Sequence, residues 1–102
     1  IQVMLADSKA EAYAAKCMVL DAARQKDVGN KITTEASCCK LFATEMVGRV
    51  ADKAVQIHGG AGYISDYAVE RLYRDVRLFR LYEGTSQIQQ MIIARNMIRD
   101  IQ

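Results

Sequence analysis

The sequence contains no proline and no tryptophan, and it has only one histidine and two phenylalanines. The absence of proline favours long helices, because proline removes a backbone N–H and clashes with the preceding turn. No apolar run approaches the roughly eighteen residues that a membrane-spanning helix needs, and no basic and then apolar leader opens the sequence. We therefore expect a helical protein with no membrane span.

An excess of charge of one sign is also lacking. Fourteen Lys and Arg residues are nearly balanced by twelve Asp and Glu residues, which leaves a net charge of +2. So weak a field does not favour nucleic acid or an anionic membrane as a partner. The three cysteines, Cys17, Cys38 and Cys39, cannot all pair with one another and have no zinc-type spacing. We expect free, mostly buried thiols and no metal site.

Helical periodicity dominates what is present. With 102 residues, 51% of them apolar, the chain is expected to form one domain. A first helix is expected to end at residues 28–30, and its apolar face carries Val3, Ala6, Ala10, Tyr13, Cys17 and Leu20. A second helix should begin near residues 33–34 and stop at Gly59 and Gly60. Its apolar face carries Ile32, Ala36, Cys39, Ala43, Met46, Val50, Ala54 and Ile57.

Two shorter helices are expected after the glycines. Ser65 or Asp66 should cap the first of them, with Glu70, Arg71 and Arg74 on its exposed side. Its apolar residues are Val69, Leu72, Tyr73 and Val76. Ser86, followed three residues later by Gln89, reads as a capping box for the last helix. The inward stripe of that helix is expected to be Ile88, Met91, Ala94, Ile98 and Ile101. The whole pattern predicts an all-α, up-down four-helix bundle.

The stretch from Gln56 to Gln87 is the unusual part of the sequence. Glycines interrupt the helical pattern twice, and Glu83 lies between an aromatic residue and a glycine. One interpretation is that both interruptions are simple turns between helices. Composition and periodicity alone do not separate this interpretation from a functional one.

Four blocks of this half resemble the carboxy-terminal part of acyl-CoA dehydrogenases, in the same order and spacing. They are residues 56–63 (QIHGGAGY), 69–71 (VER), 74–75 (RD) and 82–89 (YEGTSQIQ). The resemblance implies that residues 1–102 form the C-terminal helical-bundle domain of such an enzyme, without the first helix of that domain and without the domains upstream. The opening on Ile1, inside a helical pattern and without a methionine, agrees with this expectation.

The resemblance implies a role for Glu83 and for Gly84. In the family, the glutamate of the Tyr-Glu-Gly-Thr motif removes the α-proton of an acyl-CoA thioester while a hydride passes from the β-carbon to FAD. Here that residue is Glu83. Exclusion of water by the bound acyl chain and flavin would make the carboxylate a stronger base. Gly84 would line the substrate site, because a residue without a Cβ lets the thioester approach the backbone.

The resemblance also implies FAD-binding residues in two groups. Gln56, Ile57, His58, Gly59 and Gly60 correspond to a segment that contacts the FAD of the partner subunit. Thr85, Ser86 and Gln87, at the start of the last helix, correspond to residues beside the FAD of the same active site, although simple helix capping also explains them. His58 is interpreted as a helix-end or flavin-adjacent residue, and not as a base or metal ligand.

The expected function is therefore α,β-dehydrogenation of short- or medium-chain acyl-CoA within a longer flavoenzyme. Two alternatives stay open: an acyl-CoA oxidase, and a non-catalytic helical module for oligomerisation. The expected partners are acyl-CoA, an electron-transfer flavoprotein as electron acceptor, and further copies of the chain in a homodimer or homotetramer. The family would place the protein in the cytoplasm of a bacterium or in the mitochondrial matrix of a eukaryote.

Overall fold

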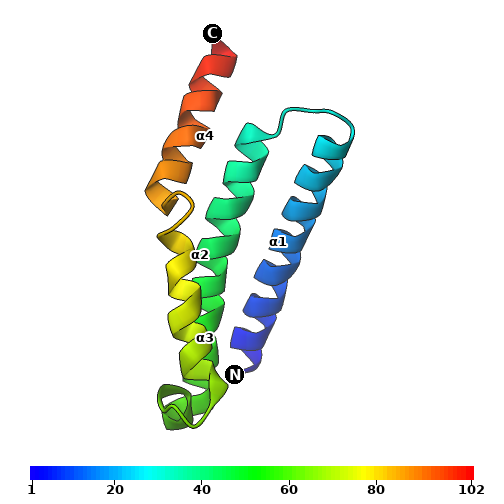
Figure 1. The fold of residues 1–102 in the computed structure, drawn as a ribbon. Helices are drawn as coiled ribbons and strands as arrows, with labels where there is room; N and C mark the ends of the chain where they lie inside the picture. Colours follow the sequence, from blue (N-terminus) through cyan, green and yellow to red (C-terminus); the bar gives the residue numbers. More distant parts are fainter.

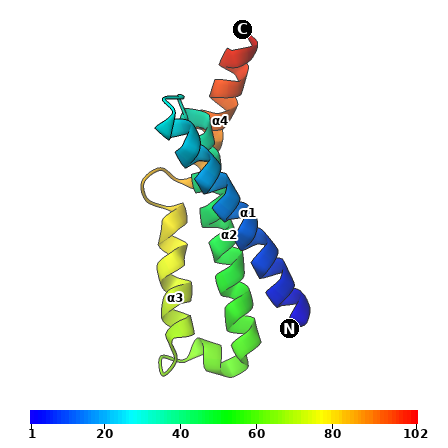
Figure 2. The same cartoon turned by 90° about the vertical axis from the view of Figure 1, so that its right-hand side faces the viewer.

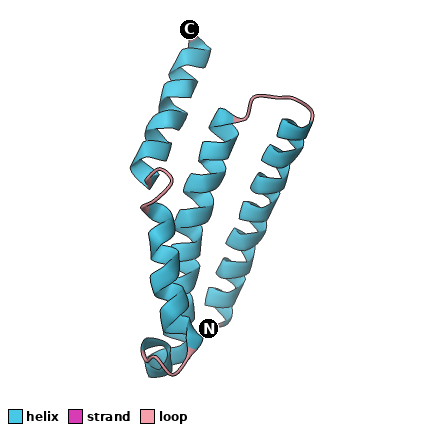
Figure 3. Cartoon of the chain, viewed as in Figure 1, coloured by secondary structure: helices cyan, strands magenta, loops and turns pink.

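The computed structural model describes all 102 residues and consists of helices, without any strand (Figures 1 and 3). The α-helices are α1 (Gln2–Asp27), α2 (Thr33–His58), α3 (Ala68–Arg77) and α4 (Ser86–Ile101). Two short 3-10 helices, η1 (Gly59–Tyr63) and η2 (Leu78–Arg80), follow α2 and α3. The all-α class, the four helices and the limits of the two long helices are confirmed. None of these helices combines the length and the apolar character needed to cross a membrane.

α2 is the central helix, and α1, α3 and α4 each pack against it. α1 runs antiparallel to α2 on one side, and α3 and α4 follow each other along the other side (Figures 1 and 2). α4 continues in the direction of α3 and does not reverse, so the up-down order holds only for the first three helices. The break between α3 and α4 contains Glu83 and Gly84, which have positive φ angles of 53° and 90°.

Both predicted caps of the short helices were wrong. α3 begins at Ala68 after an extended Tyr67, and no side chain caps it. Thr85, and not Ser86, caps α4, because the Thr85 Oγ1 accepts a hydrogen bond from the Ile88 N–H at 3.2 Å. The sequence offers two cap residues in succession, and the first helical bond, from the Gln89 N–H to the Thr85 carbonyl, selects the earlier one.

The stripe predicted to face inward on α4 points outward, and so does the apolar face predicted on α1. Tyr13 on α1 is 65% exposed and Ile98 on α4 is 59% exposed. The faces that contact α2 carry small or polar residues instead, and the buried ones are Ala15, Ala22, Ser86, Gln89 and Asn96. Periodicity shows that a helix has an apolar face, but it does not show which neighbour that face contacts.

The predicted sides of α3 also need correction. Leu72 and Tyr73, expected to be inward, are exposed. Glu70, expected to be exposed, has a side chain only 24% exposed and lies 3.8 Å from Arg74. Glu70 and Arg74 line a cleft of about 450 Å³ between α2 and α3, together with Asp52. α3 therefore presents a charged edge towards α2, and the exposed Tyr73 lines the same cleft.

The buried core is small for a chain of this mass. Only three apolar residues, Ala15, Ala22 and Met46, are buried. The accessible surface is 7362 Å², against about 5,800 Å² for a compact protein of the same mass. The radius of gyration is 16.2 Å, against about 13 Å for a compact domain of this length. The fold is elongated. Hydrogen bonds and ion pairs to α2 therefore do much to define how the other helices pack against it.

The cysteines are free thiols, as predicted, but they are less buried than predicted. Cys17 is exposed on the outer face of α1, and Cys38 and Cys39 on α2 are half-buried. Burial, followed by the neighbouring Cys38, raises the pKa of the Cys39 thiol. Cys39 is therefore held in its neutral, less reactive form.

Gly62 is the glycine at which packing leaves no room for a side chain. A Cβ there would lie 2.6 Å from the Val55 carbonyl oxygen and 3.0 Å from the Val55 Cα. We predict that Gly62→Ala destabilises the full-length protein by about 1–3 kcal/mol, because backbone atoms of α2 would have to move. The control is Gly60→Ala, where a Cβ would meet no atom within 4 Å. Urea denaturation would contradict this account if both variants unfolded at the same urea concentration.

Candidate functional site

Glu83 lies on the loop between η2 and α4, and its backbone is the most unusual in the chain. It is the only residue other than glycine with a positive φ, 53°, and its side chain is exposed. A side chain makes this left-handed conformation unfavourable, at a cost of about 1–2 kcal/mol. Residues held in such conformations cluster at active sites, where their surroundings impose the geometry. The sequence-predicted base therefore lies at the point of greatest backbone strain.

Gly84 is favoured at this break by its backbone conformation, because a φ of 90° is unfavourable for any residue with a Cβ. A Cβ there would also lie 2.6 Å from the Nε2 of Gln89, the end of a side chain that would have to shift. Gln89 is buried, and its Nε2 lies 3.5 Å from the Glu83 carbonyl oxygen. The first turn of α4 thus packs directly beneath the loop that carries Glu83.

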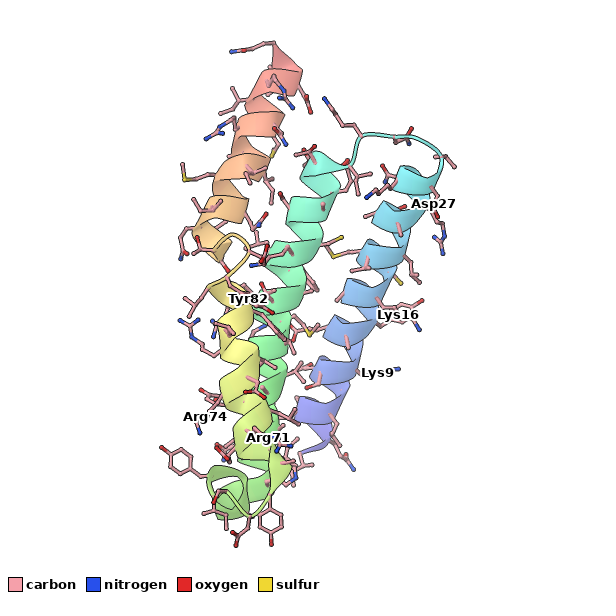
Figure 4. All side chains as sticks on the ribbon, viewed as in Figure 1. Lys9, Lys16, Asp27, Arg71, Arg74 and Tyr82 are labelled. Atoms are coloured by element: carbon pink, nitrogen blue, oxygen red, sulfur yellow. The ribbon has the colours of Figure 1, made fainter.

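Lys40, from the first third of α2, binds this loop from the other side. Its Nζ donates hydrogen bonds to the carbonyl oxygens of Phe79 at 2.8 Å and Tyr82 at 2.9 Å, and also to that of Gly84. Tyr82 lies beside α2 near the middle of the molecule (Figure 4). Sequence reasoning missed Lys40, because a lysine on a helix far away in the sequence carries no signal of the loop that it binds.

Glu45, one turn further along α2, fixes the start of α4. Its Oε1 accepts a 2.6 Å hydrogen bond from the Ser86 hydroxyl, and its Oε2 lies 3.4 Å from Arg80 Nη1. The Ser86 hydrogen bond is the main cause that lowers the pKa of Glu45; burial opposes it, and the positive charge of Arg80 adds to it. The Ser86 side chain is therefore committed to α2, and Ser86 is buried at the start of α4.

This lowered pKa gives a prediction about stability and pH. Because the folded-state pKa lies below the ordinary value of 4.5, the contribution of Glu45 is complete above that value and is lost as the pH falls through the folded-state pKa. We predict that the full-length protein is more stable than its Glu45→Gln variant near neutral pH and that the difference shrinks below pH 4.5. Urea denaturation at several pH values measures this, and a difference that grows on acidification would contradict it.

The other predicted group, residues 56–60, lies at the end of α2 and the start of η1. Gln56 and His58 are exposed, and Ile57 is half-buried. A Cβ at Gly59 or Gly60 would meet no atom within 4 Å, so the backbone here is open to a ligand. The ring Nδ1 of His58 lies 2.8 Å from the Ala54 carbonyl of its own helix. This contact agrees with the interpretation of His58 as a helix-end residue.

The structure does not bring the two predicted groups together. α3 separates them, and its ten residues span about 15 Å at about 1.5 Å per residue. Arg71 and Arg74 on α3 lie on the side of the glycine turn, whereas Tyr82 lies at the other end, near α4 (Figure 4). One group therefore surrounds the Glu83 loop and the other surrounds Gly59 and Gly60. This separation agrees with the expectation that they serve different active sites.

Comparison with known proteins identifies the family. Residues 1–98 match the family described as "Acyl-CoA dehydrogenase, C-terminal domain". The chain therefore belongs to the acyl-CoA dehydrogenase family and represents its C-terminal domain.

Several known proteins are similar to this chain in sequence or structure over nearly its whole length. The chain is 50% identical to the 3-(aryl)acrylate reductase of Clostridium sporogenes, over 97% of this chain and 26% of that protein. It is 48% identical to a subunit of the caffeyl-CoA reductase-Etf complex of Acetobacterium woodii, again over 97% and 26%. The structure of butyryl-CoA dehydrogenase from Megasphaera elsdenii superimposes with a TM-score of 0.92 at 37% identity, over 95% of this chain and 25% of that one. The chain thus spans about a quarter of the length of these relatives.

Proposed function

We propose that the whole protein is an FAD-dependent enzyme that forms a trans double bond between the α- and β-carbons of short- or medium-chain acyl-CoA. The observation that carries this proposal is Glu83, an exposed carboxylate on a left-handed backbone break, within the family's C-terminal domain. Its carboxylate would take the α-proton, and its backbone N–H would donate a hydrogen bond to the thioester oxygen. Bound FAD supplies the acceptor for the hydride that leaves the β-carbon.

The residues present fit a flavin dinucleotide in two places. At residues 59 and 60, the backbone has no neighbour where a Cβ would be, so a ligand can contact it directly. At Thr85, Ser86 and Gln87, the first turn of α4 offers backbone N–H groups with no partner in the helix, which suit anionic or polar ligand atoms. We propose that the first group, which includes Gln56, Ile57 and His58, contacts the FAD of a partner subunit, and that the second contacts the FAD beside Glu83.

The relatives raise a second candidate, reduction of the double bond. Two relatives have names that describe reductases of unsaturated acids or thioesters, and one of these names includes an Etf complex. The same carboxyl group would serve this direction, returning a proton to the α-carbon in place of removing one. The Etf in that name supports an electron-transfer flavoprotein as the electron partner. An oxidase is the third candidate, because it shares the same half-reaction and differs in using oxygen to reoxidise the flavin.

The proposed context follows from the same family. The whole protein would assemble as a homodimer or homotetramer, because the apolar outer faces of α1 and α4 are exposed, as Tyr13 and Ile98 show. It would work in the bacterial cytoplasm or, in a eukaryote, in the mitochondrial matrix.

Anaerobic titration of the full-length protein tests the proposal. Bound oxidised flavin should absorb blue light, and a saturated acyl-CoA of suitable length should bleach that absorption. An enoyl-CoA added to the reduced protein should restore the colour if the reductase direction operates, and the faster of the two reactions indicates the preferred direction. Absence of flavin, or flavin that no acyl-CoA or enoyl-CoA affects, would contradict the proposal.

A further inference from the structure

We propose that Lys40 is a positioning residue that holds the Glu83 loop in the left-handed conformation needed to present the carboxylate. This inference rests on the proposed function of Glu83. Lys40 contacts neither that carboxylate nor any other acid, since all its hydrogen bonds go to backbone carbonyl oxygens.

The donors and acceptors match in number. A lysine ammonium has three N–H donors, and Lys40 directs them to three carbonyl oxygens, those of Phe79, Tyr82 and Gly84. These three carbonyl groups flank Glu83 on both sides along the chain. Hydrogen bonds from a charged donor are roughly twice as strong as neutral ones. With all three N–H groups used, Lys40 has none left to bind a substrate or a cofactor.

The backbone cannot satisfy these carbonyl groups by itself. The last helical bonds before the loop run from the N–H groups of Leu81 and Tyr82 to the Leu78 carbonyl, and α4 begins with a bond to the Thr85 carbonyl. No backbone N–H bonds to the carbonyl oxygens of Phe79, Tyr82 or Gly84. The positive φ angles of Glu83 and Gly84 end the helical pattern here, so these carbonyl groups need a donor from elsewhere in the fold.

Lys40 supplies that donor from the most rigidly held element. α2 packs against all three other helices, and Lys40 lies in its first third, seven residues after Thr33. The bonds offset the cost of the left-handed conformation at Glu83 and define where its Cα lies relative to α2. Without them, Glu83 can relax towards a right-handed φ, which would turn its side chain away. α4 would stay in place, because Glu45 holds Ser86 separately.

The test compares Lys40→Met with Lys53→Met in the full-length flavin-loaded protein. Lys53 is the matched control, because it is also a partly exposed lysine on α2 but pairs with Glu11, 3.9 Å away, and not with the loop. In Lys40→Met we expect flavin reduction by acyl-CoA to slow by about 100-fold, the effect of a displacement of about 1 Å at a reacting group. Flavin content and the Kd for enoyl-CoA should stay within a few-fold of wild type. Hydrogen–deuterium exchange should rise in residues 81–88 alone. Lys53→Met should show none of these changes.

Several outcomes would overturn the proposal. A normal reduction rate with unchanged exchange in the loop, while Glu83→Gln is inactive, would remove Lys40 from the mechanism and leave the proposed function standing. Normal reduction in Glu83→Gln would instead remove the proposed function, and this inference with it. A rise in exchange throughout the chain would show that Lys40 supports only the fold.

If Lys40→Met does not fold, Lys40→Arg decides. The planar guanidinium keeps the charge but cannot direct three donors from one atom onto three converging oxygens. The variant should fold, reduce its flavin slowly and show raised exchange in the loop. A wild-type rate in Lys40→Arg would overturn the proposal, because charge alone would then be sufficient.

Discussion

Glu83→Gln in the full-length protein is expected to keep the fold, the flavin and the binding of acyl-CoA, and to lose nearly all flavin reduction. Glu83 is exposed and its carboxylate makes no contact that holds the fold together, so the amide is accommodated. Glutamine cannot accept the α-proton. General-base catalysis contributes about two to four orders of magnitude, and the loss should be at least that large, because proton removal and hydride transfer depend on each other. Stopped-flow reduction by acyl-CoA measures it.

Two controls define this result. Glu83→Asp keeps the carboxylate but withdraws it by one methylene, so it should retain more activity than the glutamine variant. Glu70→Gln removes an acid whose only ion pair is the 3.8 Å contact with Arg74, and it should change the rate little. If Glu83→Gln reduced its flavin as fast as Glu70→Gln does, another residue would be the base.

Gly84→Ala is expected to have the second largest effect, with losses of both rate and stability. The methyl group meets an unfavourable φ of 90° and the Gln89 side chain at 2.6 Å. The end of the Gln89 side chain can shift, but relief of the unfavourable φ moves the backbone beside Glu83, and a shift of about 1 Å can lower a catalysed rate by about 100-fold. The conformational strain itself costs about 1–2 kcal/mol of stability.

Gly29→Ala is the matched control for this substitution. Gly29 has the same φ of 90°, but it lies in the turn between α1 and α2, and a Cβ there would meet no atom within 4 Å. It should lose a similar amount of stability and none of the rate. Equal reduction rates in the two variants, measured by stopped flow beside urea denaturation, would show that the geometry at Gly84 does not matter for catalysis.

The limits of the two long helices could be predicted from the sequence because their signals are local. Gly29 and Gly59 end helices through their own backbone conformations, with positive φ angles of 90° and 63°. The inward faces could not be predicted, because Tyr13 on α1 and Ile98 on α4 belong to apolar stripes that point away from α2. A stripe is a property of one helix, whereas burial depends on which neighbour lies against it.

The candidate site divides in the same way. Glu83 and Gly84 were found through a short motif whose residues act next to one another. Lys40 and Glu45 were missed, because each forms its hydrogen bond with a residue far along the chain. Gly84 lies 44 residues after Lys40, and Ser86 lies 41 residues after Glu45. Each is an ordinary charged residue on α2 until the fold places the loop beside it. The residues proposed to carry chemistry thus came from the sequence, and the contacts that hold their loop in place required the structure.

Exchange of the α-protons of a bound thioester with D₂O tests the central claim most directly. An acyl-CoA analogue with sulfur at the β-position has no β-hydride to transfer, so its mass gain in D₂O reports proton removal alone. The flavin-loaded full-length protein should introduce deuterium at the α-carbon, and Glu83→Gln should bind the analogue equally well without introducing it. Exchange at the wild-type rate in Glu83→Gln would show that Glu83 is not the base.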